Sequence, residues 1–234
     1  MVPPHWRYFS KTALAAKCNN SRTKRKCRMT FKCKYETPAG FDDLWMNSDG
    51  EALTGLWFED SRDQSKHTLD CAERDLGVFR ETRRWLDIYF SGRQPDFTPP
   101  YRIDGLTPFR EDVVDAMLAI PFGKPLTYGD IAAALARRRG IARMSARAVG
   151  GAVGWNPICI IVPCHRVIGS NHSLTGYGGG IRNKIALLAH EGLDMNRFTI
   201  PTKRDLENPM TTAPSELTTS TYSAEKPGKQ ACPI

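Results

Sequence analysis

The sequence predicts an α/β protein in two parts: a small α/β unit with an antiparallel sheet over residues 35–104, and a mostly helical unit over residues 105–200. Two observations support this division. Residues 52–58 form an apolar run after an Asp-Gly turn signal, which is typical of a strand. From residue 107 onward, helix-capping residues recur at short intervals, which indicates several helices in succession.

The first unit also contains one predicted helix. Apolar residues recur at helical spacing at Leu76, Phe79, Leu86 and Phe90. Gly92 follows directly and is expected to end the helix. A proline-bounded linker then leads to the second unit.

The second unit begins with two capped helices. Thr107 is a good N-cap and Pro108 suits the first helical turn, so a helix is expected from here to Pro121. Thr127 caps the next helix, and Asp130 three residues later resembles a capping box.

Two further helices complete the unit. Ser145 is expected to cap a helix over residues 146–155, which with the preceding helix resembles a helix-turn-helix, although helix pairs of this kind are common. The last helix starts near Ile181 and is expected to end before Gly192.

Both ends of the chain are predicted to be disordered tails. Residues 1–34 hold ten Lys or Arg and no Asp or Glu, whereas the remaining 200 residues hold 23 basic and 25 acidic residues. The pI of 9.2 therefore reflects the tail, and any DNA-binding surface must be a local patch. Residues 201–234 are rich in Pro, Thr and Ser.

Cysteine usage and apolar content place the chain in a reducing compartment. The seven cysteines are odd in number and irregularly spaced, which argues against a disulfide framework. No apolar run reaches membrane-spanning length, and the apolar stretch at residues 12–16 is too short to be expected to act as a secretory signal. We expect a cytoplasmic protein, or a nuclear one in a eukaryote. A zinc site from Cys18, Cys27, Cys33 and His5 is conceivable, but its spacing is poor and unpaired tail thiols are favoured.

The feature with the most chemical content is Cys164 followed by His165. The apolar run at residues 158–162 predicts a buried strand, so a thiol and an imidazole emerge together where that strand ends. A thiolate is a strong nucleophile, and a nearby base or cation makes it available at neutral pH. The alternative is a core cysteine beside a surface histidine, which is the usual meaning of a bare Cys-His pair.

The surrounding sequence favours the reactive interpretation. Residues 107–192 resemble the O6-alkylguanine-DNA alkyltransferases, also called methylated-DNA–protein-cysteine methyltransferases. The matching segments are Thr107-Pro108-Phe109, Ile120-Pro121-Phe122-Gly123, Thr127-Tyr128-Gly129-Asp130-Ile131-Ala132, Ala146-Arg147-Ala148-Val149-Gly150-Gly151-Ala152, Asn156-Pro157, Ile161-Val162-Pro163-Cys164-His165-Arg166-Val167 and Leu187-Leu188-Ala189-His190-Glu191-Gly192.

The resemblance implies DNA repair by direct reversal of damage. The alkyl group of O6-methylguanine, and of O4-methylthymine, would pass from duplex DNA to Cys164, and each molecule would react once. It also implies a ribonuclease-H-like first domain, a winged-helix-like second domain, binding in the minor groove and a monomer. No metal and no organic cofactor is expected.

The same resemblance assigns roles around Cys164. His165 would take the thiol proton through a water, and Glu191 would orient the imidazole. Asn156 would join the recognition helix to the active-site turn, and Tyr128 would contact the flipped base and its 3′ phosphate and protonate the leaving guanine at N3. The alternatives are a solvated helix-end charge for Glu191, an Asn-Pro turn for Asn156 and a core aromatic for Tyr128.

The DNA-binding residues are expected on the helix after Ser145. Arg147 would fill the space that the extruded nucleotide leaves. Small residues beside it, Ala146, Gly150 and Gly151, would let the helix backbone approach the groove. A solvated arginine is the default alternative for Arg147.

The lesion pocket is expected to involve Tyr177, Gly178, Val153 and Val167. Gly178 stands where many relatives carry a serine that hydrogen-bonds O6, so Tyr177 and backbone N–H groups would hold the lesion instead. A non-enzymatic lesion binder or a transcriptional regulator is the rival class. It is disfavoured because Cys164 is present and the N-terminal cysteines do not match a regulatory zinc domain.

Overall fold

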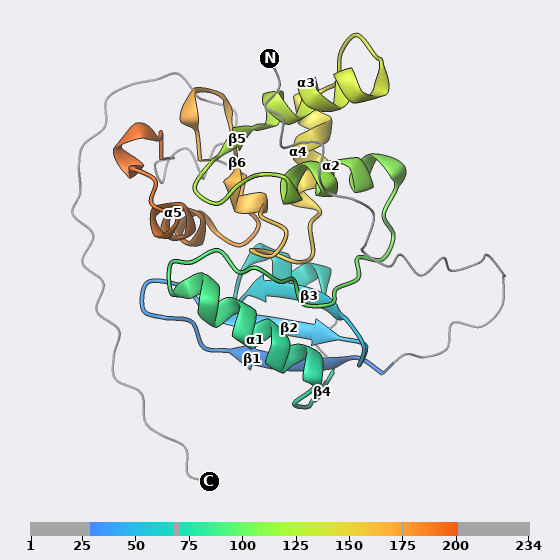
Figure 1. The fold of residues 1–234 in the computed structure, drawn as a ribbon, viewed down its shortest axis with the longest axis vertical. Coiled ribbons are helices and arrows are strands. Elements are labelled where there is room, and N and C mark those ends of the chain that lie inside the picture. The colour runs from blue at the N-terminus through green and yellow to red at the C-terminus, as the bar shows by residue number, and fades with distance from the viewer. Residues whose placement is uncertain (1–28, 68–70, 175, 201–234) are drawn as a thin grey trace, which may run out of the picture.

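The computed structural model describes residues 29–67, 71–174 and 176–200. A sheet crossed by one helix forms one half of the molecule, and the other helices form the second half beside it (Figure 1). The sheet half consists of β1 (Phe31–Tyr35), β2 (Leu44–Ser48), β3 (Leu53–Phe58), a short 3-10 helix η2 (Arg62–Lys66), β4 (Ala72–Glu73) and α1 (Gly77–Phe90).

The sheet has the strand order β3-β2-β1-β4 and is mixed. β1–β2 and β2–β3 are antiparallel, but β4 is parallel to β1, so the predicted all-antiparallel sheet is wrong in its last strand. The first strand also begins at Phe31, inside the predicted tail. Lys32 and Lys34 gave that segment a tail-like composition, although they alternate with buried Phe31 and Tyr35, as the pleat of a half-buried strand requires.

The helix α1 confirms the predicted helix before Gly92. Its buried face packs against the sheet and is formed by Val78, Phe79, Thr82, Trp85, Leu86 and Tyr89. The chain leaves the helix through Gly92 at φ 82°, a conformation that glycine adopts without steric cost.

The helical half confirms the predicted caps. It contains α2 (Pro108–Leu118), β5 (Leu126–Thr127), α3 (Tyr128–Arg139), α4 (Ala146–Gly154), β6 (Val167–Ile168) and α5 (Ile181–His190). The hydroxyl of Thr107 accepts from the backbone N–H of Arg110, and Thr127 and Asp130 form a complete capping box. Ser145 caps α4 in the same way. Within the described ranges no helix combines the length and the apolar character needed to cross a bilayer.

One continuous apolar core joins the two halves. The outer edge of β3 is covered by the segment that leads to Cys164: the N–H of Leu56 donates to the carbonyl of Pro157 at 3.0 Å, and the N–H of Cys159 donates to the carbonyl of Leu56 at 2.9 Å. The sheet therefore holds the segment before Cys164 in place, and that segment in turn protects a sheet edge.

The predicted strand at residues 158–162 is wrong. Ile158 makes an isolated β-bridge to Leu56, and the chain then turns, with the N–H of Ile161 donating to the carbonyl of Cys159 at 2.7 Å. Ile160 adopts φ 63°, which is strained for a β-branched residue. The run is apolar because it is buried on all sides, and periodicity alone cannot distinguish such a turn from a buried strand.

Candidate active site

Cys164 begins a short 3-10 helix, η3 (Cys164–Arg166), and is only 6% exposed. Cys164 and His165 therefore do not emerge from the end of a strand, as the sequence predicted, but from a helical turn. Among the described residues no hydrogen bond joins their side chains.

The side-chain amide of Asn156 forms hydrogen bonds with the backbone on both sides of the turn at residues 158–162. Its Nδ2 lies 3.1 Å from Sγ of Cys164, 3.0 Å from the carbonyl of Val162 and 3.1 Å from that of Ile158. Its Oδ1 accepts the N–H of Ile158 at 3.0 Å. One buried side chain thus links the end of α4 to the thiol and fixes the turn between them.

His165 and Glu191 meet in the interior. Nε2 of His165 lies 2.7 Å from Oε1 of Glu191, and neither side chain is exposed. Nδ1 of His165 is buried and has no hydrogen-bond partner among the described residues. Glu191 is therefore a buried carboxylate bound to an imidazole rather than a solvated charge at a helix end.

The carboxylate of Glu191 has three further partners that the sequence did not reveal. Nε of Arg166 lies 2.9 Å from Oε2, the hydroxyl of Tyr89 donates to Oε1 at 2.9 Å, and the N–H of Gly123 donates to Oε2 at 3.0 Å. Gly123 sits at φ 67°, and a Cβ there would lie 2.8 Å from the carbonyl oxygen of Glu191. The end of α5 is thus tied to α1, to the loop after α2 and to η3.

Burial and these contacts set the protonation states. Burial raises the pKa of Cys164, while the hydrogen bond from Asn156 and the charges of Lys66 and Lys184 act against that rise. Burial lowers the pKa of His165 despite the opposing effect of Glu191, so the imidazole is neutral and able to accept a proton.

Glu191 behaves in the opposite way. Burial alone would raise its pKa, but the hydrogen bonds from His165 and Arg166 and the charge of Arg166 outweigh burial and hold the pKa well below the usual range. Glu191 is therefore ionised at neutral pH.

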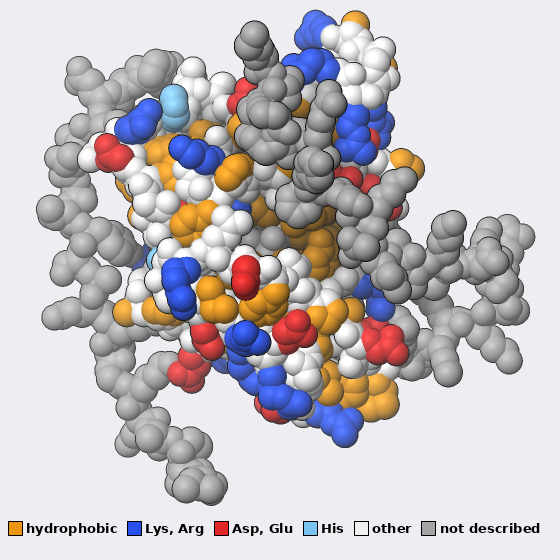
Figure 2. Space-filling view, viewed as in Figure 1, with side chains coloured by type: hydrophobic (Ala, Val, Ile, Leu, Met, Phe, Trp, Pro, Cys, Tyr) orange, Lys and Arg blue, Asp and Glu red, His pale blue; other side chains and the backbone are white. Residues whose placement is uncertain are grey.

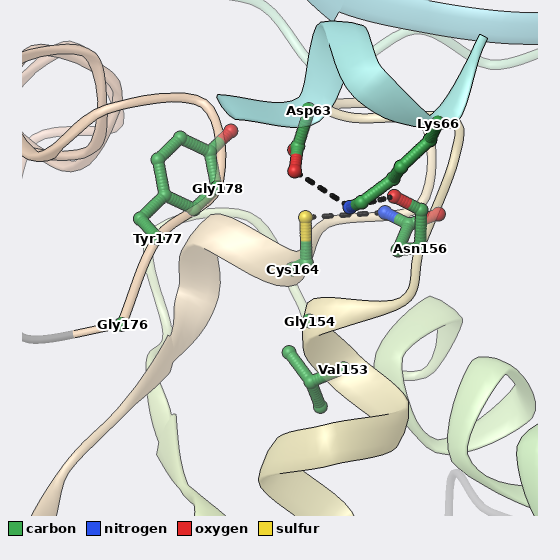
Figure 3. A pocket seen from close by; sticks show the side chains of 9 residues that line it. All are labelled: Asp63, Lys66, Val153, Gly154, Asn156, Cys164, Gly176, Tyr177 and Gly178. Carbon is green, nitrogen blue, oxygen red and sulfur yellow. Dashed lines mark hydrogen bonds and ion pairs between the residues drawn. The ribbon is translucent and has the colours of Figure 1, made fainter. Parts of the chain in front are cut away.

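The sulfur of Cys164 lies at a small cavity of about 10 Å³ (Figure 3). The cavity is lined by Asp63, Lys66, Val153, Gly154, Asn156, Cys164, Gly176, Tyr177 and Gly178. Tyr177, Gly178 and Val153, three of the residues expected in a lesion pocket, are among those that line this cavity. Val167 is not part of the lining: it is buried and accepts a hydrogen bond from Nζ of Lys184 through its carbonyl at 2.6 Å.

Two tyrosines stand beside this cavity. The hydroxyl of Tyr177 is buried without a hydrogen-bond partner among the described residues. Tyr128 begins α3, and its hydroxyl would lie 3.3 Å from a Cβ on Gly176. Burial, followed by the proximity of Cys164, raises the pKa of Tyr128 to about 12, so this phenol remains a proton donor.

The predicted DNA-contacting residues lie on the surface of α4. Ala146, Arg147 and Gly151 are exposed, and a Cβ on Gly151 would meet only open space. Gly150 is half-buried against the ring of Tyr128. Arg147 is not part of the cavity lining.

Basic side chains also gather at the end of α3 and in the loop that follows it (Figure 2). Two of them are engaged within the protein, since Nε of Arg139 donates to Asp112 at 2.7 Å and Nη2 of Arg138 lies 2.9 Å from the same carboxylate. Arg137 and Arg143 are exposed.

The three N-terminal cysteines considered for a zinc site divide between two regions. Cys18 and Cys27 lie outside the described residues, and Cys33 lies in β1, where Nη2 of Arg83 is 2.7 Å from its sulfur. In the described part of the chain no group of three or more His, Cys, Asp and Glu side chains is arranged to hold a metal ion.

Comparison with known proteins agrees with this geometry. A family model for the DNA-binding domain of 6-O-methylguanine DNA methyltransferase matches residues 108–193. The methylated-DNA–protein-cysteine methyltransferase of Salmonella typhimurium is 40% identical over 167 residues, which cover 68% of this chain and 94% of the relative. The corresponding protein of Mycobacterium bovis is 47% identical over 117 residues, or 50% of this chain and 67% of the relative.

The chain belongs to the methylated-DNA–protein-cysteine methyltransferases. Solved structures agree: Mycobacterium tuberculosis OGT in complex with DNA matches with a TM-score of 0.58 and 37% identity, over 72% of this chain and 94% of that one. The O6-methylguanine-DNA methyltransferase of Pyrococcus kodakaraensis matches with a TM-score of 0.50 and 26% identity, over 70% of this chain and 100% of that one.

As a methylated-DNA–protein-cysteine methyltransferase, the protein is a suicide alkyltransferase that repairs DNA by moving an alkyl group onto one of its own cysteines. The suggested rival, a lesion binder or regulator without this activity, is thereby set aside.

The sequence missed three charged residues near the thiol. Asp63 and Lys66 reach the cavity from η2, in the sheet half, and Lys184 comes from α5. Burial lowers the pKa of Lys184 to about 8. None of the three belongs to a local pattern that points to the cysteine, because they approach it only through the tertiary fold.

Proposed function

We propose that Cys164 is the alkyl acceptor and that it takes the alkyl group from O6 of methylguanine, and from O4 of methylthymine, in duplex DNA. The observation that carries this proposal is the position of the Cys164 sulfur at a cavity, held by Asn156, next in sequence to a neutral His165 that is bound to Glu191. This combination supplies a nucleophile, a base and a group that orients the base.

The first step is deprotonation of the thiol. The proton passes through a water to Nδ1 of His165, the ring nitrogen that Glu191 leaves available. Glu191 stabilises the resulting imidazolium, and the nearby charges of Lys66 and Lys184 favour the thiolate.

The second step is displacement at the alkyl carbon. The C–S bond forms as the bond from the alkyl carbon to O6 breaks, and the electron pair of that bond moves to O6. Tyr128 donates its proton to N3, so that neutral guanine leaves, and it recovers a proton from solvent. The thioether on Cys164 is stable, so each molecule reacts once.

Access to O6 requires the base to leave the helix stack, because O6 is engaged in the base pair. We infer that α4 lies in the minor groove and that Arg147 fills the space left by the extruded nucleotide. The exposed positions of Ala146, Arg147 and Gly151 support this orientation. Gly150 brings the helix close to Tyr128, which contacts the flipped base and its 3′ phosphate.

We also infer that the sheet half is ribonuclease-H-like, that the helical half is winged-helix-like, and that residues 35–104 and 105–200 correspond to these two domains. The protein acts as a monomer in the cytoplasm, or in the nucleus of a eukaryote. Residues 1–34 and 201–234 act as tails, except that β1 already occupies Phe31–Tyr35.

The substrate proposal is tested with three duplexes that are identical except for O6-methylguanine, O4-methylthymine or no lesion. Excess protein should remove the methyl group from both lesions, and the Cys164→Ala variant should bind all three duplexes but remove nothing. Removal of neither methyl group by the wild-type protein would contradict the proposal.

A further inference from the structure

Two side chains from the sheet half occupy the alkylguanine pocket. Asp63 and Lys66 extend from η2 across the cavity toward the sulfur of Cys164 (Figure 3). Nζ of Lys66 lies 2.6 Å from Oδ1 of Asp63 and donates to the carbonyl of Asn156 at 3.0 Å. The Asp63 side chain is only 7% exposed, whereas that of Lys66 is 24% exposed, so the pair reaches from the solvent edge into the interior.

The carboxylate of Asp63 fills the volume above Gly178. A Cβ added to Gly178 would collide with Oδ1 of Asp63. The cavity that remains beside Cys164 is about 10 Å³, which is roughly the space that one water needs. A purine cannot lie against the sulfur while Asp63 holds this position.

The segment that carries Asp63 is anchored at its end, where the ring of His67 stacks on that of Trp57 with centroids 4.0 Å apart. Its backbone hydrogen bonds are local, from Gln64 to Ser61 and from His67 to Gln64. In the part of the chain that the structure describes, the hydrogen bond that links η2 to the helical half is the one from Lys66 to the carbonyl of Asn156. The net contribution of such a hydrogen bond is modest, because water replaces part of it once Lys66 is exposed.

We propose that Asp63, held by Lys66, is a displaceable plug of the alkylguanine pocket, and that its departure sets how fast a substrate reaches Cys164. The plug leaves when the extruded base enters and returns when the pocket is empty. In free protein it keeps small electrophiles away from a cysteine that can be used only once.

The charge of Asp63, like its volume, opposes reaction at Cys164. After burial itself, Asp63 is among the groups that raise the pKa of Cys164. The other groups that act on the sulfur are Asn156, Lys66 and Lys184. Withdrawal of Asp63 removes a negative charge from the side of the thiol just as the substrate arrives, which favours the thiolate.

The test uses the full chain and two probes that need no DNA. One is the free base O6-benzylguanine, and the other is iodoacetamide, with labelling of Cys164 followed by peptide mass mapping. Asp63→Ala removes volume and charge, and Asp63→Asn removes the charge alone. Asp60→Asn is the matched control, because Asp60 is exposed on the same connection and asparagine tolerates its φ of 55°.

We expect Asp63→Ala to increase the reaction rate of Cys164 with both probes by about tenfold. That factor corresponds to the loss of about 1.4 kcal/mol of the free energy that favours the closed position of Asp63. Asp63→Asn should give a smaller increase, and Asp60→Asn should react like wild type. An unchanged or reduced rate in Asp63→Ala, with an unchanged melting temperature, would overturn the proposal.

A second variant tests the steric contact itself. Gly178→Ser should lower the melting temperature, because its side chain competes with Asp63 for one volume, and Asp63→Ala in the same chain should restore it. Equal effects of Gly178→Ser with and without Asp63 would also overturn the plug. The iodoacetamide arm does not require alkyltransferase activity, so failure of the assignment of Cys164 as acceptor, on which the proposal rests, is distinguishable from failure of the plug.

Discussion

Nε2 of His165 lies 2.7 Å from Oε1 of Glu191, and both side chains are completely buried. Glu191 thereby fixes the imidazole ring and stabilises its protonated form. The same carboxylate also binds Arg166, Tyr89 and the backbone of Gly123, so one residue supports both the proposed chemistry and the junction of the two halves.

The first prediction concerns activation of the thiol. If His165 receives the proton of Cys164, His165→Ala and Glu191→Gln should move the pH profile of alkylation toward that of a free thiol, near ~8.5. The profile is measured with O6-methylguanine duplex at saturating DNA. Binding of undamaged DNA serves as the control and should be nearly unchanged. If both variants keep the wild-type profile, His165 and Glu191 do not activate the thiol.

The second prediction concerns stability. Glu191→Gln leaves the buried guanidinium of Arg166 without its charged partner, and such a loss typically costs about 3–5 kcal/mol in the free energy of unfolding at neutral pH. Because the pKa of Glu191 is lowered by folding, its stabilising effect is complete above the unfolded value of about 4.3 and declines as the pH falls below that value.

Denaturant unfolding at pH 7 and near pH 3 measures this effect. The difference between wild type and Glu191→Gln should shrink at the lower pH. Glu81→Gln on the exposed face of α1 is the matched control and should match wild type at both values. A constant difference between the two pH values would show that the lost charge is not the cause.

The third prediction concerns base extrusion. Arg147→Ala should slow repair of duplex DNA far more than reaction with free O6-benzylguanine, because Arg147 lies on the exposed face of α4 and does not line the cavity. Tyr128→Phe, which removes the proton donor, should slow both reactions. Arg147→Lys keeps the positive charge. It therefore distinguishes attraction to the DNA phosphates from occupation of the space that the extruded nucleotide leaves. Equal losses on both substrates in Arg147→Ala would assign Arg147 to the pocket or the fold.

The fourth prediction concerns the basic tail. Residues 1–28 hold eight Lys or Arg and no acidic residue, and they can be deleted without touching β1, whereas deletion to residue 34 would remove most of that strand. Each phosphate neutralised changes the log–log salt slope of DNA binding by roughly 0.9. Deletion should therefore flatten this slope and leave reaction with the free base unchanged.

A metal site in the tail would give a different result. If Cys18, Cys27 and Cys33 held a metal that supports the sheet half, the deletion would lower the melting temperature and slow the free-base reaction as well. Cys18→Ser in the full chain is the matched control, and it should behave like wild type if the tail acts through charge alone.

The capped helices were predictable because their signals are local. Thr107, Thr127 and Ser145 mark the starts of α2, α3 and α4, and each makes the hydrogen bond that its residue type favours. The turn after Ile158 was not predictable, since its backbone is dictated by Asn156 and by the edge of β3. The contact with β3 joins segments that lie far apart in the sequence, and the hydrogen bonds of Asn156, although close in sequence, follow no periodic pattern.

The candidate site also contains residues that local motifs predict and residues that only the tertiary packing brings in. Cys164, His165, Asn156 and Glu191 stand in recognisable motifs, and the structure brings them together. The approach of Asp63 and Lys66 depends on how η2 packs across the pocket, and no periodicity or spacing records that packing. The mixed sheet escaped prediction for a similar reason, because β4 is only two residues long.

The most direct measurement is the intact mass of the protein after incubation with excess O6-methylguanine duplex, followed by peptide mapping of the product. The mass should rise by one methyl group per molecule and no more, the methyl group should map to Cys164, and Cys164→Ala should gain no mass. A methyl group on Cys159, or removal of several methyl groups per protein molecule, would contradict the account.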